Sequence, residues 1–286
     1  MRLRVFAPAK VNLTLQVTGR RSDGYHLLDS LVAFADVGDT ITLSKSDRPR
    51  LDITGAQAGS LNADKDNLVV QALALFDDTF DASLEKNLPV ASGIGGGSSD
   101  AAAALRGAAQ LSGRALPDDQ SILALGADVP VCVTARPARM QGIGEQLTPL
   151  ALPPLPAVLV NPRVQVSTKA VFSAGSFGRH DCKAPPADPS ATDLIAWLRT
   201  QGNDLQEPAL DLAPEIGLVL QALEHRTGCR LARMSGSGAT CFGLFDTGEN
   251  AVRAATDLIR EHAQWWVQSC WIGDQSARAS PQADSS

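Results

Sequence analysis

A run of glycines that leads directly into an alanine-rich segment limits most strongly how this chain can fold. Residues 93–100 read Gly-Ile-Gly-Gly-Gly-Ser-Ser-Asp, and the alanine-rich stretch from Ala101 to Leu111 follows without a break. Alanine and leucine favour helix, so the pattern predicts a glycine loop that ends in a helix. The N–H groups of such a loop can surround an anion, and the helix directs its free N–H donors and its positive dipole end to the same place. The segment therefore predicts a phosphate-binding loop.

This loop differs from two common phosphate-binding patterns. No Lys follows the glycines, which excludes the Walker sequence, and Ser98 stands where the last glycine of G-x-G-x-x-G belongs. A serine-capped turn without a ligand is the alternative interpretation of an isolated glycine loop. Asp100 falls in the first helical turn, where a carboxylate interacts favourably with the helix dipole, so we expect a structural role for it.

Hydrophobic patterning elsewhere predicts a mixture of strands and helices. Two early strands are expected at Arg2 to Phe6 and Val11 to Val17, separated by the turn-prone Ala7-Pro8-Ala9. Asp66 or Asn67 should cap a helix. The remaining expected elements are that helix over residues 68–76, strands at 30–43 and 157–160, and an exposed connection at 173–190.

Length and composition favour two domains of ordinary size. The chain has 286 residues, of which 44% are hydrophobic and 20% charged, as is typical of a globular protein. A proline-rich stretch at 150–156 precedes a predicted strand, so we expect one domain over residues 1–152 and a second over 153–273. Residues 274–286 are mostly small and polar, and we expect them to form a disordered tail.

Charge and cysteine content argue against several classes of protein. The net charge of −6 leaves no basic excess for coating nucleic acid or an anionic membrane. The five cysteines are odd in number and form no C-x-x-C pair, so we expect reduced thiols and neither a disulfide framework nor a zinc site. The sequence shows no signal peptide or membrane-spanning run, which predicts a cytoplasmic location.

Three short segments place polar or small residues in an apolar setting. Lys10 and Asn12 interrupt an apolar strand, Asp128 stands between a glycine and a short apolar run, and residues 234–242 form a second small-residue loop before a strand. Taken singly, each has an ordinary explanation: a solvated lysine, a turn aspartate and a hairpin turn.

Taken in chain order, the first of these segments, the glycine loop and the second small-residue loop resemble the three signature motifs of the GHMP kinases. The matching segments are Pro8 to Leu13, Pro89 to Ala103 and Ser235 to Thr240. The resemblance implies an α/β fold of two domains, the N-terminal one like domain 2 of ribosomal protein S5 and the C-terminal one a GHMP kinase domain. It also implies an active cleft between them, ATP as phosphoryl donor, and Mg²⁺ bridging the β- and γ-phosphates.

Further segments resemble one branch of that family, which phosphorylates a cytidyl diphosphate alcohol. They are residues 20–31, with Gly-Tyr-His at 24–26, and residues 93–104, 126–130, 142–145 and 203–205. The resemblance implies transfer of the ATP γ-phosphoryl group to the 2-hydroxyl of 4-diphosphocytidyl-2-C-methyl-D-erythritol, a step of the non-mevalonate route to isoprenoids.

The same resemblance implies a role for each matching residue. Asp128 takes the role of base, and Lys10 lies beside it and helps to polarise the hydroxyl. Tyr25 would stack on cytosine, His26 would pair with the polar edge of that base, and Phe172 would lie on its opposite side. The remaining implied residues are Asn12, at the erythritol portion, and, at ATP, Pro89, Val90, Ala91, Ser92, Gly93, Ile94, Gly95, Gly96, Gly97, Ser98 and Ser99. The sequence identifies no protein ligand for Mg²⁺.

Two other interpretations stay open at this level. The chain could be another GHMP small-molecule kinase, of homoserine or mevalonate type, or a non-catalytic nucleotide-binding protein of the same fold. Tyr25 and His26 argue against the first, and the presence of both Lys10 and Asp128 argues against the second. We expect ATP and a small-molecule substrate as partners, neither nucleic acid nor membrane, and a monomer or homodimer.

Overall fold

The computed structural model describes residues 1–22, 24–178 and 183–284. The strands are β1 Arg2–Asn12, β2 Gln16–Arg20, β3 His26–Lys45, β4 Arg50–Thr54, β5 Phe80–Glu85, β6 Ala138–Gly142, β7 Gln146–Pro149, β8 Leu155–Asn161, β9 Cys229–Met234, β10 Cys241–Phe245, β11 Trp266–Gly273 and β12 Gln282–Ala283. The helices are α1 Leu68–Leu73, α2 Gly96–Ser112, α3 Asp119–Leu125, α4 Val129–Thr134, α5 Thr168–Ala174, α6 Ala191–Leu198, α7 Gln206–Leu212, α8 Glu215–Glu224, α9 Gly248–Glu261 and α10 Ser276–Ala279, with a 3-10 turn at Ala58–Ser60.

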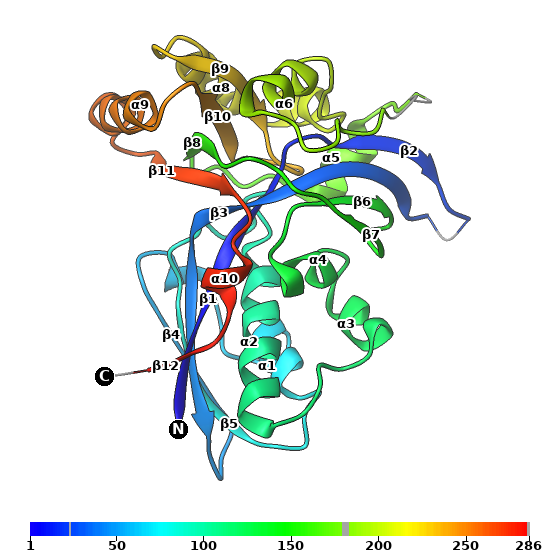
Figure 1. The fold of residues 1–286 in the computed structure, drawn as a ribbon, viewed down its shortest axis with the longest axis vertical. Coiled ribbons are helices and arrows are strands. Elements are labelled where there is room, and N and C mark those ends of the chain that lie inside the picture. Colours follow the sequence, from blue (N-terminus) through cyan, green and yellow to red (C-terminus); the bar gives the residue numbers. More distant parts are fainter. Residues whose placement is uncertain (23, 179–182, 285–286) are drawn as a thin grey trace.

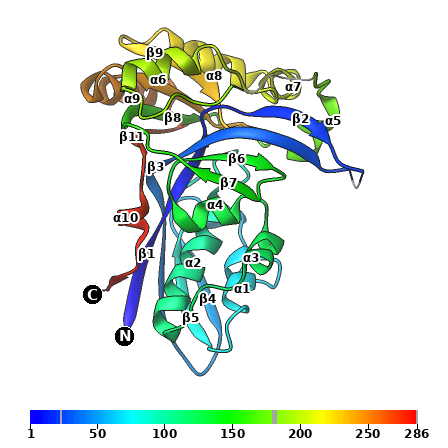
Figure 2. The ribbon, with the colours of Figure 1, turned by 45° about the vertical axis from the view of Figure 1, so that its right-hand side comes forward.

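The long strand β3 organises one continuous sheet, whose main path runs β12-β1-β3-β11-β8-β10-β9. It pairs in antiparallel fashion with β1, β2, β5, β6 and β11, and so it joins the two halves of the chain. Figures 1 and 2 show α1 to α4 gathered beside the lower part of this sheet, and α6, α8 and α9 at its upper end. The predicted strand at residues 30–43 is confirmed, and it is longer than predicted.

Alternating side chains bury both faces of the upper sheet. In β8, Val158 and Val160 pack with buried residues of α7, α8 and α9, whereas Leu155 and Leu159 pack with buried leucines of α6. Below, α2 lies on β1 and β3 through Ala101 to Ala104, all fully buried. Because alanine side chains are small, the helix comes close to the strands and brings its N-terminus near the centre of the sheet.

The prediction of two early strands separated by Ala7-Pro8-Ala9 is wrong. β1 is one strand, and its pairing with β3 shifts register between Pro8 and Lys10. Paired residues on antiparallel strands share a face. Before the shift, Val5 pairs with a β3 residue that belongs to the core under α2. After the shift, Lys10 pairs with Phe34, which belongs to the same core. The irregularity therefore turns Lys10 and Asn12 to the α2 side, as β-bulges near active sites often do.

The prediction of a disordered tail is wrong for residues 274–284. Residues 276–279 form α10, and β12 pairs with β1 at Leu3 and Arg4. Arg106 of α2 donates to the carbonyl of Ala279 at 2.9 Å, and Ala279 is 1% exposed. Backbone pairing and one buried alanine thus hold a segment whose low hydrophobicity gave no sign of order. The proposed boundary at residues 152 and 153 falls just before β8 and stays a prediction.

Two further findings concern the state of the cysteines and the length of the helices. The four described cysteines, Cys132, Cys229, Cys241 and Cys270, are free thiols, while Cys182 and part of the expected connection at 173–190 lie outside the described residues. Within the described ranges, no helix combines the length and apolar character that a membrane crossing requires.

Candidate active site

A cavity of about 310 Å³ lies where three distant segments of the chain meet. The irregularity in β1 turns Lys10 and Asn12 into it, and the loop before α4 adds Asp128. The lining also includes Gly93, Gly95, Gly96, Gly97, Ser98, Phe172, Gly236 and Ser237. The three segments that the sequence suggested as a set therefore converge on one cavity.

An ammonium and a carboxylate form an ion pair in this cavity. Lys10 Nζ donates to Asp128 Oδ2 at 2.8 Å and to Asn12 Oδ1 at 3.0 Å, and Lys10 is only 3% exposed. Asp128 is the N-cap residue of α4, yet its side chain makes no capping hydrogen bond there, so the carboxylate is available to the cavity. Asn12 Nδ2 donates to Ser30 Oγ at 2.8 Å, which fixes the amide that orients Lys10.

The glycine loop lies directly against Lys10. Gly95 is the N-cap of α2 with φ +62°, and a Cβ at this position would come within 3.1 Å of Lys10 Cβ. The Lys10 N–H donates to the carbonyl of Ile94 at 3.0 Å, while the Ile94 side chain is fully buried in the core. Only glycine combines the left-handed backbone with this close approach.

The start of α2 offers free N–H donors at the cavity. The Ser99 N–H bonds to the Gly95 carbonyl at 2.8 Å, so helix geometry leaves the N–H groups of Gly96, Gly97 and Ser98 without an intrahelical acceptor. The predicted phosphate contact of Ser99 is not supported, because its hydroxyl donates to the Pro8 carbonyl at 2.6 Å and the residue is 1% exposed. The helix turns Ser99 toward β1 and Ser98 toward the cavity.

A second cavity of about 240 Å³ adjoins the first and shares Leu68, Ala91, Gly96 and Gly97 with it. Its other lining residues are Leu61, Asn67, Val69, Leu84, Pro89 and Val90, together with the charged Lys86 and Asp100. Asn67 caps α1 by accepting from the Val69 N–H at 2.9 Å, so of the two predicted candidates, Asp66 and Asn67, the second is the cap. The N-terminal part of the predicted loop, residues 89–91, thus forms a wall that is mostly apolar.

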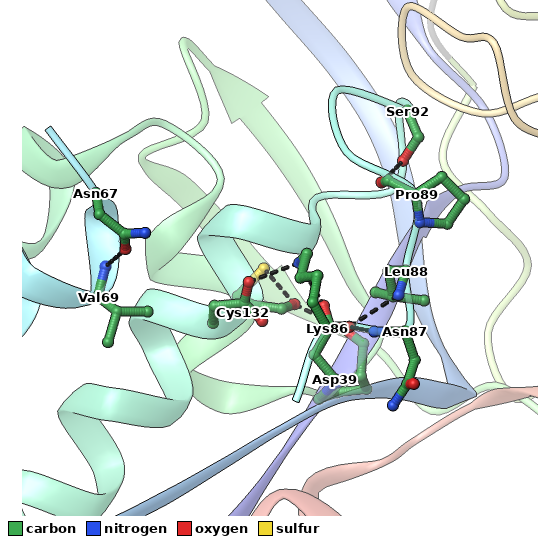
Figure 3. A network of polar contacts seen from close by, with 12 residues as sticks. Asp39, Asn67, Val69, Lys86, Asn87, Leu88, Pro89, Ser92 and Cys132 are labelled. Carbon is green, nitrogen blue, oxygen red and sulfur yellow. Dashed lines mark hydrogen bonds and ion pairs between the residues drawn. The ribbon is translucent and has the colours of Figure 1, made fainter. Parts of the chain in front are cut away.

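A buried charge cluster, which sequence reasoning missed, lies under the glycine loop. Lys86 Nζ donates to Asp39 Oδ2 at 2.5 Å and to Asp100 Oδ2 at 2.6 Å, and the three side chains are at most 4% exposed. Asp39 also accepts from the N–H groups of Asn87 and Leu88, as Figure 3 shows. Burial raises the pKa of Asp100 to about 8. The negative charge of the neighbouring Asp39 also raises this pKa, and the positive charge of Lys86 opposes both effects. The cluster ties both ends of the loop to β3 and agrees with the structural role predicted for Asp100. The predicted reason is wrong, because the first turn of α2 holds no acidic residue, and Asp100 acts through Lys86 and not through the helix dipole.

The second small-residue loop, residues 235–240, connects β9 to β10 and packs on the glycine loop. Ser235 Oγ accepts from the Asn12 N–H at 3.0 Å and donates to the Gly93 carbonyl at 2.9 Å. A Cβ on Gly93 would lie 2.4 Å from the Ser235 carbonyl oxygen, so the two backbones touch. The sequence predicted a hairpin turn here, and the loop does connect two antiparallel strands. The loop also contacts the other two motifs, at Asn12 and Gly93.

Near the cavity, two of the three predicted aromatic residues come together. The rings of His26 and Phe172 stack with centroids 4.6 Å apart and an interplanar angle of 17°. Burial and, less strongly, the charge of Arg20 lower the pKa of His26, which favours the neutral imidazole. Tyr25 is 62% exposed at the tip of the β2–β3 hairpin, and of the three residues only Phe172 lines the 310 Å³ cavity.

Family models match both halves of the chain. The model of the GHMP kinases N terminal domain matches residues 67–137, and that of the GHMP kinases C terminal domain matches residues 190–264. With the Lys–Asp pair beside a glycine loop, this fold and site define an ATP-using kinase of the GHMP class that acts on a small molecule.

Individual relatives narrow the assignment. A 4-diphosphocytidyl-2-C-methyl-D-erythritol kinase of Roseobacter denitrificans is 51% identical, over 98% of this chain and 96% of that protein. One of Ruegeria pomeroyi is 55% identical, over 93% of this chain and 98% of that protein. A crystal structure of 4-(cytidine 5'-diphospho)-2C-methyl-D-erythritol kinase superposes with a TM-score of 0.77 at 35% identity, covering 94% of this chain and 99% of that one. The chain belongs to the 4-diphosphocytidyl-2-C-methyl-D-erythritol kinase family.

Proposed function

We propose that the chain transfers the γ-phosphoryl group of ATP to the 2-hydroxyl of 4-diphosphocytidyl-2-C-methyl-D-erythritol, in the non-mevalonate route to isoprenoids. The observation that carries this proposal is the Lys10–Asp128 pair, at 2.8 Å, in the same cavity as the free N–H groups at the start of α2. An alcohol at the pair would lie next to a phosphate on the helix terminus.

ATP would lie across the two adjoining cavities. The 240 Å³ cavity has a mostly apolar wall suited to adenine, formed among others by Leu68, Pro89 and Val90. The glycines that both cavities share, Gly96 and Gly97, would lie under the phosphates and donate their N–H groups to them. The γ-phosphate would then point into the larger cavity.

The chemistry needs one proton acceptor and several donors. The acceptor hydroxyl oxygen would bond to the γ-phosphorus while the bond to the β,γ-bridging oxygen breaks and ADP leaves. Asp128 would receive the hydroxyl proton, and Lys10 would hold that oxygen by charge and hydrogen bonding. The N–H groups of Gly96, Gly97 and Ser98 would stabilise the charge on the transferring group, because fixed dipoles need no reorganisation during the reaction.

The acceptor would extend from the Lys–Asp pair toward the β2–β3 hairpin. Its cytosine would lie among Tyr25, His26 and Phe172, and the neutral His26 could both donate and accept hydrogen bonds at the base edge. The His26 and Phe172 rings stack on each other, so the base would have to separate them or lie beside them. Asn12, which lines the cavity beside Lys10, would contact the erythritol portion.

Mg²⁺ fits this site only as an ion carried largely by ATP. Over the described ranges, no group of three or more His, Cys, Asp or Glu side chains could form a protein cage for a metal. Mg²⁺ bound to nucleotides commonly keeps phosphate oxygens and waters with one or two protein ligands. When bound, it would neutralise charge on the β- and γ-phosphates, and Asp128 and Ser98, which both line the cavity, carry side-chain oxygens that could add a protein ligand.

A coupled ADP-release assay tests the proposal. Purified chain should release ADP with the cytidyl diphosphate alcohol and ATP, and much more slowly with mevalonate or homoserine. Equal rates with mevalonate or homoserine would reject the substrate assignment. We further propose a cytoplasmic enzyme, in keeping with its free thiols, and a monomer or homodimer, which light scattering of the same preparation would determine.

A further inference from the structure

The Asn203-Asp204 dipeptide has no part in the chemistry proposed above, yet it lies at a junction of the fold. It belongs to the connection between α6 and α7, and Asn203 forms a parallel bridge with Leu15, just before β2. The Asp204 N–H donates to the Leu15 carbonyl at 2.9 Å, and the Leu15 N–H donates to the Gly202 carbonyl at 3.0 Å. Figure 2 accordingly shows α7 close to β2.

The Asn203 amide holds the loop of residues 235–240. Its Nδ2 donates to the carbonyls of Met234 and Gly236, both at 2.8 Å, and its Oδ1 accepts from the Leu205 N–H at 3.0 Å. The residue is 8% exposed. The Asn203 amide group therefore donates to two carbonyls at the start of the same loop. Because this region is buried, the loss of that donor would leave the two carbonyls unpaired.

That loop in turn supports the glycine loop. Ser235 Oγ links the Asn12 N–H to the Gly93 carbonyl, and a Cβ on Gly236 would lie 2.7 Å from the Gly93 carbonyl oxygen. With backbones in contact at Gly93, a displacement of Gly236 must be passed to the glycine loop. Asn203 thus acts on the proposed phosphate site without touching it.

Asp204 faces the other way, toward the acceptor side. Its Oδ2 accepts from the Val17 N–H at 2.8 Å. Val17 lies in β2, which pairs with β3 up to Arg20 opposite His26, and Tyr25 lies at the tip of that hairpin. The carboxylate thereby anchors the base of the hairpin that carries the proposed cytosine contacts.

We propose that Asn203 and Asp204 are adjacent positioning residues with separate targets: Asn203 sets the phosphate loops for ATP, and Asp204 sets the β2–β3 hairpin for the acceptor. The inference rests on the proposed function for the identity of the acceptor. A purely structural role would lower stability and leave the two Michaelis constants in their original ratio.

Two variants of the full chain test this division. Asn203→Asp has the same shape and replaces the donating Nδ2 by an oxygen that faces two carbonyls, so KM for ATP should rise about tenfold or more, since small displacements near the chemistry are costly. Asp204→Ala removes the acceptor of the Val17 N–H, so KM for the cytidyl diphosphate alcohol should rise by a similar factor. The ratio of KM for ATP to KM for the alcohol therefore increases in the first variant and decreases in the second.

Matched controls isolate the hydrogen bonds. Asp204→Asn keeps an oxygen that can accept from Val17 and should regain most of the affinity for the alcohol that Asp204→Ala loses, while Asn250→Asp, at a partly exposed amide on α9 that bonds within its own helix end, should change neither constant. If Asn203→Asp does not fold, Asn203→Ser keeps one hydroxyl donor and should move the ratio the same way by less. The inference is overturned if the ratio of KM for ATP to KM for the alcohol changes in the same direction in both variants, or changes in neither.

Failure of the proposed function is distinguishable from failure of this inference. A wild-type chain that does not phosphorylate the cytidyl alcohol rejects the function alone. Calorimetric binding of ADP then still tests Asn203, because ADP should bind about tenfold more weakly to Asn203→Asp and unchanged to Asp204→Ala. Equal ADP affinity in wild type and Asn203→Asp overturns the assignment of Asn203.

Discussion

Replacing Asp128 by Asn separates its proposed chemistry from its place in the fold. Asparagine has the same shape and can still accept a hydrogen bond from Lys10 Nζ, which lies 2.8 Å from Asp128 Oδ2. The Asp128 side chain does not cap α4, so the helix loses no capping bond. The substitution removes the negative charge and the capacity to take a proton.

The expected loss of turnover is large and the loss of stability small. A positioned general base contributes about 10²- to 10⁴-fold to rate, which corresponds to about 3–5 kcal/mol in the activation free energy. The Asp128 side chain is 34% exposed and is screened by solvent, whereas the Lys10 side chain is 4% exposed and keeps a hydrogen-bond acceptor in the Asn variant, so we expect a cost of about 1–2 kcal/mol. In a chain of this size, that amount lowers Tm by only a few degrees.

The assay is steady-state ADP release at saturating ATP and alcohol, with ADP affinity measured by calorimetry and Tm by scanning calorimetry. Asp119→Asn is a matched control, because Asp119 is an exposed carboxylate in the first turn of α3. We expect kcat of Asp128→Asn to fall at least about 100-fold with nearly unchanged ADP affinity. A kcat within a few-fold of wild type would refute the assignment of Asp128 as base.

Three further predictions follow from single features. Gly95→Ala places a Cβ 3.1 Å from Lys10 Cβ at φ +62°, so stability should fall by about 1–2 kcal/mol in urea unfolding, with a larger than tenfold drop in kcat/KM; a fully active variant would contradict the tight approach. Because burial lowers the pKa of His26 below its ordinary 6.5, the imidazole stays neutral to lower pH, and KM for the alcohol should rise only as pH falls below 6.5. The same pH profile in His26→Gln would show that another group titrates. Burial raises the pKa of Asp100 from 3.8 to about 8, so the folded state keeps a proton that the unfolded chain loses, and stability should decline as pH rises between these values; Asp100→Asn should flatten that decline in Tm, and an unchanged slope would reject the explanation.

Signals within a single segment predicted their elements well. The helix cap at Asn67, the helix after the glycines and the strand at residues 30–43 were all recognisable, because capping, propensity and alternation are local properties. The Lys10–Asp128 pair joins residues 118 positions apart, and it was accessible only through the resemblance of ordered motifs to a known family.

Features that depend on register were not predictable. The sequence predicts a turn where the structure has a register shift between Pro8 and Lys10, because a proline between apolar runs is typical of both. Lys86 and Asp39 are 47 positions apart, and no spacing rule brings them together beneath the loop. The one available signal was Lys86 itself, an isolated cation three residues before Pro89 at the start of the predicted phosphate loop.

The tail shows the limit of composition as a guide. Residues 274–284 carry few apolar side chains, so the sequence predicted disorder. They are held instead by strand pairing with β1 and by Arg106, whose guanidinium donates to the Ala279 carbonyl. Backbone hydrogen bonds of this kind depend on a partner surface and leave no mark on local hydrophobicity.

The most direct test of the central claim is a double-mutant cycle on kcat with Lys10→Met, Asp128→Asn and the double variant. If the ammonium and the carboxylate act as one unit on the same hydroxyl, the double variant should be about as slow as the slower single variant. Rate losses that simply multiply would show that the two groups act independently, and would contradict the account of this site.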